Sequence, residues 1–297
     1  MDVLLATFNG EKYLEEQLES LDRQEDVNVR VWANDDGSVD NTLNILHKWQ
    51  KRGLIKGISK TSRVGSTRGF LGLLSERSDS EYVAFCDQDD LWDPRKLIYQ
   101  IKKMSGDDAQ MVFSRRDYIN DQNQKVGQST KPRRKISLNN AVIENSAPGN
   151  TQMLNRQAVK FINQISHSKV QHYDAWTYLL INAIGECKYI DMPLVRYRIH
   201  DENAVGVRKF DIRRILCWPD PYYNQALNLV NAINETVFEE NFTEVDQFLK
   251  FVEEPKRSKR IIKSFCLDFY RQRKFDNLIM IITLIVRAPK ESPSIDC

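Results

Sequence analysis

Three segments of this chain place acidic and polar side chains directly after short apolar runs. They read ATFNG from residue 6, NDDGS from residue 34 and DQDD from residue 87. In DQDD, three carboxylates within four residues repel one another unless a cation lies between them. Oxygen ligands at this density suit Mg²⁺ or Mn²⁺, which can bridge a diphosphate and neutralise charge that develops on a leaving group. The alternatives are a solvated acidic turn for DQDD and a helix-capping turn for NDDGS.

The apolar runs before these segments predict strands of an α/β fold. Over the first hundred residues, short apolar runs alternate with amphipathic helical patterns, as in a parallel sheet covered by crossover helices. One helix carries Leu14, Leu18 and Leu21 at helical spacing, and a second spans residues 40–51. Because ligands bind at the carboxyl ends of strands in open parallel sheets, the three segments are the first candidates for a site. The predicted strands are residues 3–7, 29–33, 55–59, 82–86 and 111–113.

The later part of the chain is less regular. Residues 121–137 are polar and basic with few apolar anchors, which predicts a mobile loop. A helical pattern follows at residues 175–184, then a pair of strands at 187–190 and 194–199, and then helices to the end.

Several classes of protein are disfavoured by what the sequence lacks. No GxGxxG follows the first strand and no GxxxxGK[ST] occurs, so a dinucleotide pocket and a P-loop are not indicated. A donor diphosphate would rely on a metal and on basic side chains such as Arg63 or Arg68. The five cysteines form no CxxC pair, which argues against zinc and redox motifs and favours a reduced, cytosolic setting.

The N-terminus lacks the pattern of a secretory signal, and the longest apolar stretch, residues 278–286, is too short to span a bilayer.

Six segments in order resemble glycosyltransferase family 2, and within it the bacterial rhamnosyltransferase-like branch. They are ATFNGEKYLEEQLESLDRQ, NDDGSVDNT, FCDQDDLWDPRKL, PGNTQMLNR, HYDAW and YRIHDENAVG. The resemblance covers about the first 206 residues. It implies the nucleotide-diphospho-sugar transferase (GT-A type) fold, with a mostly parallel central sheet flanked by helices. We expect a catalytic domain at residues 1–208 and a helical C-terminal extension at 209–297.

The resemblance also implies roles for individual residues. Asp36 would read the base, Asp87 and Asp89 match the DxD pair that binds Mn²⁺ or Mg²⁺, and Asp174 falls at the position of the general base. Such a carboxylate can take the acceptor proton while the metal stabilises the departing diphosphate. The predicted nucleotide-sugar residues are Ala6, Thr7, Asn9, Asp36, Arg68, Asp87 and Gln88, and the predicted metal residues are Asp87, Asp89 and His200. The predicted acceptor residues are Trp92, Gly149, Asn150, His172 and Trp176.

Structural alternatives remain open for three of these residues. Asp174 precedes a helical pattern and could cap it, a role that is compatible with catalysis. His172 and His200 each lie beside an apolar run, where a histidine is often a packed residue rather than a ligand.

The resemblance implies an inverting, divalent-metal-dependent glycosyltransferase of bacterial surface polysaccharide synthesis. The expected donor is a nucleotide-diphospho-sugar, either dTDP-rhamnose or a UDP-hexose, and the expected acceptor is a saccharide or a lipid-linked oligosaccharide. The alternatives are a nucleotidyltransferase and a non-catalytic carbohydrate-binding or scaffold subunit. No nucleic-acid partner is expected.

The C-terminal part is strongly basic. Residues 255–290 hold ten Lys or Arg against two acidic residues, while residues 1–254 hold 33 against 37. From residue 256 these cations mix with apolar residues, which is typical of a basic amphipathic helix on an anionic membrane surface. The alternative is a helical subdomain that packs on the catalytic domain or pairs with a second copy as a homodimer. We expect a cytoplasmic protein, peripheral at the inner face of the cell membrane.

Overall fold

The structure is a computed structural model of the 297-residue chain. It describes residues 1–77, 79–165 and 170–200. Beyond residue 200 it describes 224, 226–229, 231, 243–254, 256, 258–259, 268–274, 278, 280–281 and 285. The predicted domain boundary at residue 208 and the end of the YRIHDENAVG motif lie outside the described residues.

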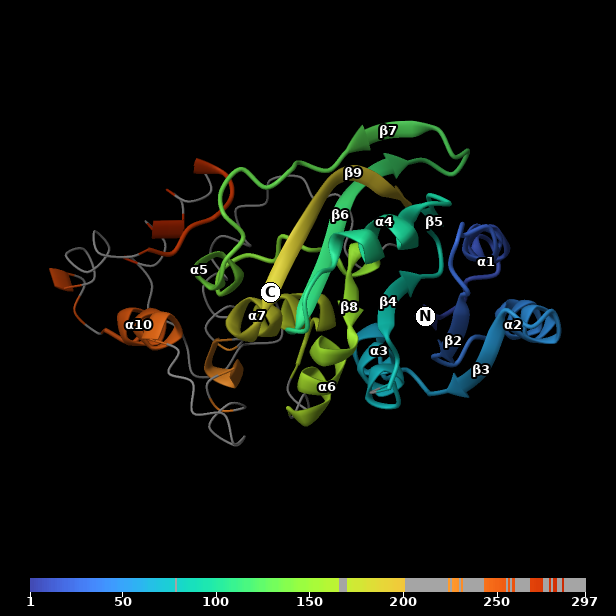
Figure 1. Cartoon of the computed structure of the whole chain (residues 1–297), viewed down its shortest axis with the longest axis horizontal. Helices are drawn as coiled ribbons and strands as arrows, with labels where there is room; N and C mark the ends of the chain where they lie inside the picture. The colour runs from blue at the N-terminus through green and yellow to red at the C-terminus, as the bar shows by residue number, and fades with distance from the viewer. Residues whose placement is uncertain are drawn as a thin grey trace.

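A single nine-stranded sheet forms the centre of the molecule, in the order β3-β2-β1-β4-β8-β6-β9-β5, with β7 paired to β6 (Figure 1). The pairs among β3, β2, β1 and β4 are parallel, as is the pair of β6 with β9, while β8 runs antiparallel between β4 and β6. The strands are β1 (Asp2–Thr7), β2 (Arg30–Asp35), β3 (Ile55–Lys60), β4 (Tyr82–Asp87), β5 (Leu91–Trp92), β6 (Gln110–Ile119), β7 (Lys125–Gln128), β8 (Met153–Asn155) and β9 (Glu186–Arg198). The α/β architecture predicted from the sequence is confirmed.

Helices cover both faces of the sheet because its central strands are apolar on both sides. In β1, Val3 and Leu5 join a core with α1, α2 and α4, while Leu4 faces a second core with α3, α6 and α7. The helices are α1 (Leu14–Asp22), α2 (Thr42–Lys51), α3 (Ser66–Ser75), α4 (Lys96–Lys103), α5 (Leu138–Ala141), α6 (Arg156–Gln164), α7 (Tyr173–Ile184) and α10 (Thr243–Val252).

The prediction of a mobile loop at residues 121–137 is wrong in part, because β7 lies within it. β7 pairs antiparallel with β6 and forms a hairpin at one margin of the sheet (Figure 1). Polar contacts across the pair hold this strand, since Lys125 and Gln128 both bind the carboxylate of Asp117. The strand carries one large apolar residue, the exposed Val126, so the sequence offers no alternating pattern to detect.

The predicted strand pair at residues 187–190 and 194–199 is wrong in its connection, because both parts belong to one strand, β9. The pairing of β9 with β6 shifts register on both sides of Arg115, opposite residues 190–195. Pro193 lies at this irregularity and has no N–H to donate to a neighbouring strand. The bulge therefore interrupts the alternation without ending the strand.

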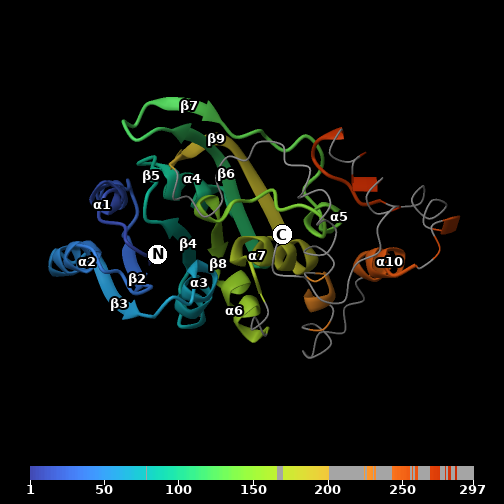
Figure 2. The ribbon, with the colours of Figure 1, turned by 180° about the vertical axis from the view of Figure 1, so that it is seen from behind.

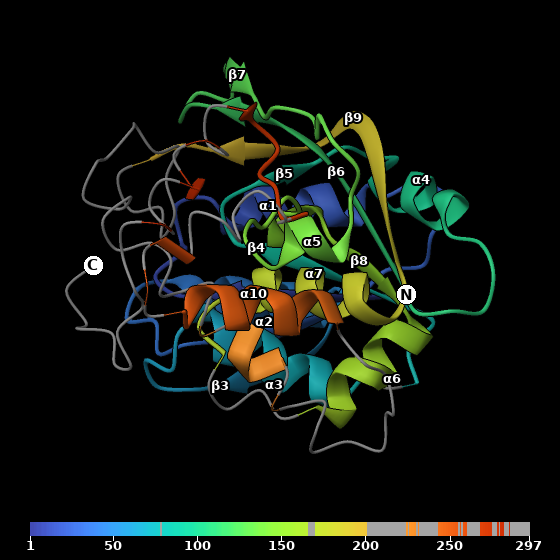
Figure 3. The ribbon, with the colours of Figure 1, turned by 90° about the vertical axis from the view of Figure 1, so that its left-hand side faces the viewer.

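The described residues after 242 pack on the part of the chain that forms the sheet. Val245, Phe248 and Phe251 of α10 join the same core as α3, α6 and α7. The backbone carbonyl of Tyr270 accepts a hydrogen bond from Asn140 at 3.0 Å. Figure 2 shows α10 on the side of the molecule opposite to α1 and α2, and in Figure 3 it lies in front of α5 and α7. These contacts favour the packed subdomain for the residues concerned, while much of the basic stretch after residue 256 lies outside the described residues.

Within the described residues, no helix combines the length and the apolar character needed to cross a bilayer.

Gly185 connects α7 to β9, and its substitution tests how closely this connection packs. A Cβ at Gly185 would collide with the backbone oxygen of Ala109, which cannot rotate away. We expect Gly185→Ala to lower the free energy of unfolding by about 1–3 kcal/mol in urea denaturation. The matched control is Gly72→Ala in α3, where no heavy atom lies within 4 Å of the added Cβ. This control should be neutral or stabilising by up to about 1 kcal/mol, and equal effects of the two changes would contradict the packing described.

Candidate active site

The three acidic and polar segments meet at one edge of the sheet. In the parallel register, Ala6 of β1 lies opposite Asn34 of β2 on one side and Asp87 of β4 on the other. The carboxyl ends of these strands therefore bring the segments after them together. The meeting of the three segments follows from the strand order.

Thr7 and Asn9 hold the segments together with their side chains. The Thr7 hydroxyl donates to Asp35 at 3.0 Å, and the Asn9 side-chain oxygen accepts from the backbone N–H of Val39 at 3.0 Å. Asn9 adopts φ 47°, a left-handed conformation that asparagine tolerates better than most residues. Both residues therefore fix the edge beside Ala6 through contacts within the protein.

The two aspartates of NDDGS have different partners. Asp35 is buried and binds the backbone and hydroxyl of Ser38, which closes the turn. Asp36 accepts hydrogen bonds from the Thr61 hydroxyl and from the backbone N–H groups of Val64 and Gly65, each at 2.8 Å. These hydrogen bonds outweigh the effect of burial and lower the pKa of Asp36. The Asp36 carboxylate thus anchors the segment from residue 61 to 65.

The turn after β4 is joined to the end of β1 through Gln88. Its side-chain oxygen accepts from the Phe8 backbone N–H at 2.8 Å, and its amide donates to the Phe8 carbonyl at 3.0 Å. The Phe8 ring is 40% exposed, and the Arg63 guanidinium lies over it at 5.6 Å from the centroid. Arg68 is exposed on the first turn of α3. Phe8 offers an aromatic face that the motif analysis did not single out.

The acidic turn concentrates negative charge in a poorly solvated place. Burial raises the pKa of Asp87 to about 7, and the charges of Asp89 and Asp174 act in the same direction. Burial and the carboxylates of Asp89 and Asp87 raise the pKa of Asp90 well above its usual range. Lys96 lies fully buried behind this turn, and burial lowers its pKa to about 7. The alternative of a solvated acidic turn does not fit this burial.

His200 and Arg198 reach the acidic turn from the end of β9. The imidazole Nε2 of His200 lies 2.8 Å from a carboxylate oxygen of Asp89, and the two side chains are only 12% and 14% exposed. The buried Arg198 donates from Nε to the backbone oxygen of Asp89 at 3.0 Å. The Tyr13 ring lies between them, with its centroid 5.2 Å from that of His200 and 4.5 Å from the Arg198 guanidinium.

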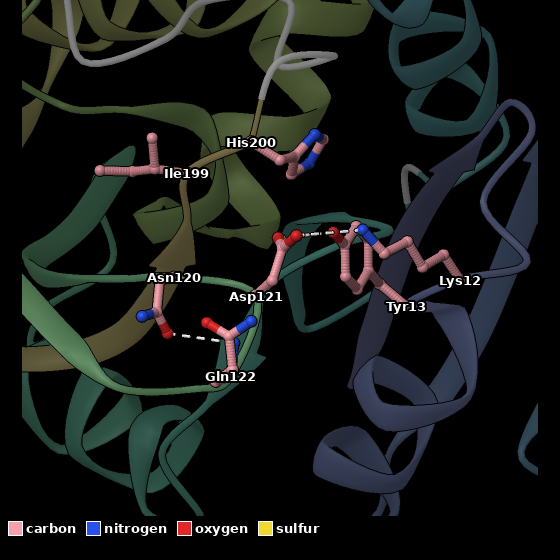
Figure 4. A pocket seen from close by; sticks show the side chains of 7 residues that line it. All are labelled: Lys12, Tyr13, Asn120, Asp121, Gln122, Ile199 and His200. Atoms are coloured by element: carbon pink, nitrogen blue, oxygen red, sulfur yellow. Dashed lines mark hydrogen bonds and ion pairs between the residues drawn. The ribbon is translucent and has the colours of Figure 1, made fainter.

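A polar cavity of about 460 Å³ opens on the outer side of His200. Figure 4 shows the Asp121 carboxylate directed toward Tyr13 and Lys12, with His200 on another wall of the cavity. Asp121 accepts from the Tyr13 hydroxyl at 2.7 Å and from Lys12 at 3.1 Å. The cavity is lined by Lys12, Tyr13, Asn120, Asp121, Gln122, Ile199 and His200.

The side chains near the acidic turn fit a divalent cation whose coordination shell is completed by oxygen atoms of a substrate. Within the described residues, no three His, Cys, Asp or Glu side chains are arranged as a ready-made metal site. Mg²⁺ and similar cations are commonly bound by one or two carboxylates and by phosphate oxygens rather than by a cage of protein ligands. Asp89 and His200 already converge on each other, with Asp87 beside them, which suits this partial coordination.

Asp174 lies in the first turn of α7 and is held at both oxygens. One oxygen accepts from the backbone N–H of Ala175 and the other from the Asn145 side chain, both at 2.8 Å. Burial raises the pKa of Asp174, although His172 and these donors act in the opposite direction. His172 is exposed and occupies the N-cap position, so Asp174 is not the N-cap itself.

Most of the predicted acceptor residues are buried. Trp92 and Trp176 are 4% and 2% exposed and lie in the two cores. Asn150 is buried and donates to Asp90, and a Cβ at Gly149 would collide with the Tyr173 hydroxyl. These four residues contact other protein groups rather than solvent, and we leave them out of the proposed acceptor surface. His172 is the exposed member of the set.

Arg116 on β6 is a candidate that no motif indicated. Its positive charge lowers the pKa of Asp87 and Asp90, and its guanidinium lies 4.3 Å from the centroid of the Tyr197 ring. Its Nε is buried and has no hydrogen-bond partner within the described part of the chain. The residue lies in the interior of a strand, 26 positions after Asp90, and only the fold brings it to the acidic turn.

Comparisons with known proteins identify the family of the chain. The model of the family described as glycosyl transferase family 2 matches residues 2–175, more than half of the chain. The dTDP-rhamnosyl transferase RfbG of Shigella flexneri is 26% identical over 254 residues, which cover 80% of this chain and 87% of that protein. The Escherichia coli enzyme WfgD, named UDP-Glc:alpha-D-GlcNAc-diphosphoundecaprenol beta-1,3-glucosyltransferase, is 25% identical over 214 residues, which cover 71% of this chain and 81% of the enzyme.

Two solved structures show the same fold at low identity. Staphylococcus aureus TarS 1-349 in complex with UDP-GlcNAc aligns with a TM-score of 0.60 at 18% identity, covering 89% of this chain and 72% of that one. The mannosyltransferase PcManGT from Pyrobaculum calidifontis, in complex with GDP-Man and Mn²⁺, aligns with a TM-score of 0.54 at 14% identity, covering 96% and 85%. The predicted GT-A type fold is confirmed.

The raised pKa of Asp87 predicts a stability change in the metal-free protein. Between the usual carboxyl pKa and about 7, the unfolded chain ionises this group more readily than the folded chain, so folding loses stability as pH rises. Asp87→Asn removes this penalty. We expect its melting temperature to exceed that of the parent protein at pH 7.5, and the difference to shrink toward pH 5. The exposed Asp22→Asn serves as the control, and a lower melting temperature of Asp87→Asn at pH 7.5 would contradict the electrostatic account.

Proposed function

The chain belongs to glycosyl transferase family 2 and is a glycosyltransferase, and we propose that it moves a sugar from a nucleotide-diphospho-sugar donor to a saccharide acceptor with inversion. The observation that carries this proposal is the clustering of Asp87 with two other acidic groups at the carboxyl edge of the sheet. The carboxylates of Asp89 and Asp174 both act on the pKa of Asp87. A proposed metal-binding group and a proposed proton acceptor thus lie near the same carboxylate, which suits a direct displacement.

The nucleoside is proposed to lie at the shared edge of β1 and β2. Asp36 would read the base together with the segment from residue 61 to 65 that it anchors, and Phe8 offers an aromatic face beside it. Thr7, Asn9 and Gln88 would act by holding this edge, beside Ala6. Because these contacts exist within the protein itself, the pocket is organised in advance of binding.

The cation is proposed to bind at Asp89 and His200, with Asp87 beside them. When bound, Mn²⁺ or Mg²⁺ would neutralise negative charge on the departing nucleoside diphosphate. Arg116 is proposed to donate to the diphosphate, because its guanidinium lies near the acidic turn and its buried Nε has no partner in the described chain. Arg68, exposed at the start of α3, is a second candidate for this contact.

Asp174 is proposed to be the general base. Its carboxylate accepts N–H donors at both oxygens and is therefore oriented to take the proton of an acceptor hydroxyl. The exposed His172 beside it would contact the acceptor. The base and the cation site act on different atoms, because one receives a proton and the other faces the leaving group.

The donor is proposed to be dTDP-rhamnose or a UDP-hexose, and the acceptor a lipid-linked saccharide of a bacterial surface polysaccharide. RfbG is named as a dTDP-rhamnosyl transferase, and the name of WfgD specifies UDP-Glc and a diphosphoundecaprenol-linked sugar. An acceptor of this kind would place the protein at the inner face of the membrane, where the basic C-terminal stretch would meet anionic lipid. A nucleotidyltransferase or a non-catalytic scaffold has less support, since a scaffold gains nothing from closely spaced buried carboxylates.

Removal of the metal ligand tests the cation site. We expect Asp89→Ala to fold normally, to lose Mn²⁺ binding in calorimetry, and to lose release of nucleoside diphosphate. EDTA should do the same to the parent protein, and added Mn²⁺ should restore the parent but not the variant. Full turnover of the parent in excess EDTA would contradict the proposal.

Substitution of the base separates binding from chemistry. Asp174→Asn keeps the shape of the side chain but cannot accept the acceptor proton, so turnover should fall by roughly 10²–10⁴. Donor and Mn²⁺ affinities, measured by calorimetry, should stay near parent values because Asp36 and Asp89 are unchanged. The exposed Asp22→Asn is the matched control and should transfer sugar like the parent. Near-parent turnover of Asp174→Asn would show that another group, such as His172, takes the proton.

A further inference from the structure

Asn145 contacts the carboxylate that the proposed reaction needs as its base. Its side-chain nitrogen donates to Asp174 Oδ2 at 2.8 Å. The residue belongs to the segment between α5 and the short 3-10 helix Gly149–Thr151, 29 positions from Asp174 in the sequence. No motif of the sequence singled it out.

The orientation of the Asn145 amide is fixed by a second hydrogen bond. Its oxygen accepts from the backbone N–H of Ala147 at 2.9 Å, and a backbone N–H can only donate. Turning the amide over would set its NH₂ against this N–H and its oxygen against the Asp174 carboxylate. Asn145 therefore presents a donor, and not an acceptor, to Asp174.

The segment that carries Asn145 is tied to the start of α7. The buried Gln152 donates from its amide to the backbone oxygens of Ala147, at 2.6 Å, and of Asp174, at 2.9 Å. The Thr177 hydroxyl donates to the Gln152 oxygen at 2.7 Å, which fixes that amide as well. Gln152 thus joins the backbone of Asp174 to that of Ala147, two residues after Asn145.

We propose that Asn145 is a positioning residue of the transfer reaction, which holds the Asp174 carboxylate in the orientation that receives the acceptor proton. The inference rests on the proposed function of Asp174. With Ala175 bound to one oxygen and Asn145 to the other, and the backbone N–H of Gly149 also acting on the carboxylate, its rotation is restricted. During transfer, the acceptor O–H bond breaks, its proton passes to Asp174, and the acceptor oxygen bonds to the sugar as the nucleoside diphosphate leaves.

The ionisable groups that act on Asp174 do not replace this contact. His172 is exposed and acts through its charge, while Asp87 and Tyr173 interact with Asp174 unfavourably when ionised. The side-chain hydrogen bond to Asp174 comes from Asn145.

Two substitutions of Asn145 distinguish a hydrogen-bond donor to Asp174 from a residue that only packs in the segment. Asn145→Asp keeps the shape and the acceptor for the Ala147 N–H, but sets an oxygen against Asp174. Asn145→Ala removes both contacts and leaves a gap. If Asn145 acts as a donor to the base, turnover should fall at least as far in Asn145→Asp as in Asn145→Ala, by roughly 10²-fold. If it only holds the chain, the isosteric Asn145→Asp should be the milder change.

The measurement is release of UDP or dTDP from UDP-glucose and dTDP-rhamnose with Mn²⁺, alongside donor affinity by calorimetry and the melting temperature. Donor affinity should stay near that of the parent. Asn182→Asp is the matched control on α7, where the amide donates to the Tyr178 backbone oxygen at 2.8 Å, and it should turn over like the parent. If Asn145→Asp does not fold, Asn145→Leu removes the donor without adding a charge, and its turnover should fall similarly.

The outcomes separate this inference from the proposed function. If the parent and Asn182→Asp transfer sugar and Asp174→Asn does not, near-parent turnover of Asn145→Asp or Asn145→Leu overturns the role of Asn145 alone. If Asp174→Asn is fully active, the base assignment and the role of Asn145 both fail. A parent protein that releases no nucleoside diphosphate from any donor overturns both proposals.

Discussion

Mutual repulsion among the carboxylates at the end of β4 is the constraint around which the rest of the site is arranged. The pKa values of Asp87 and Asp90 are raised first by burial and then by the nearby charge of Asp89. The fold surrounds this turn with donors and cations drawn from distant parts of the chain. Arg198 binds its backbone, Asn150 binds Asp90, and His200 binds Asp89. A cation with a diphosphate would complete this compensation, so ligand binding and local stability are linked through the same charges.

Several side chains at the site form hydrogen bonds within the protein itself, independently of any substrate. Thr7 and Gln88 close the edge between β1 and its neighbours, and Asp36 anchors the segment from residue 61 to 65. Such contacts limit the freedom that the free site would lose on binding, which favours affinity without adding contacts to the ligand. A residue of this kind can be necessary for activity although its side chain contacts only other protein groups and not the ligand.

The sequence predicts those parts of the structure that depend on local pattern and strand order. β1, β2 and β4 are short apolar runs, and their parallel pairing places the following segments at one edge. β7 is not predictable in the same way, because it depends on cross-strand contacts to Asp117 rather than on apolar alternation. The register shift near Pro193 likewise hides that β9 is continuous.

At the level of single residues, motifs locate the neighbourhood but not the direction of a side chain. Trp92 and Asn150 lie in recognisable segments, yet one faces a core and the other faces Asp90. Arg116 and Asn145 lie in segments without a signature and reach the site only through the sheet and through Gln152.

The two halves of the proposed chemistry therefore have different origins. The cation site depends on the ends of β4 and β9, which meet through sheet pairing of β5 with β9 and through Arg198. The base depends on α7, whose first turn is fixed to the neighbouring segment by Gln152 and Asn145. Because an inverting displacement needs the acceptor and the leaving group on opposite sides of one carbon, the distance between these two units sets the reaction geometry. The fold controls that distance through β4, whose Asp87 interacts electrostatically with both Asp89 and Asp174, and through the core that packs α7 against the sheet.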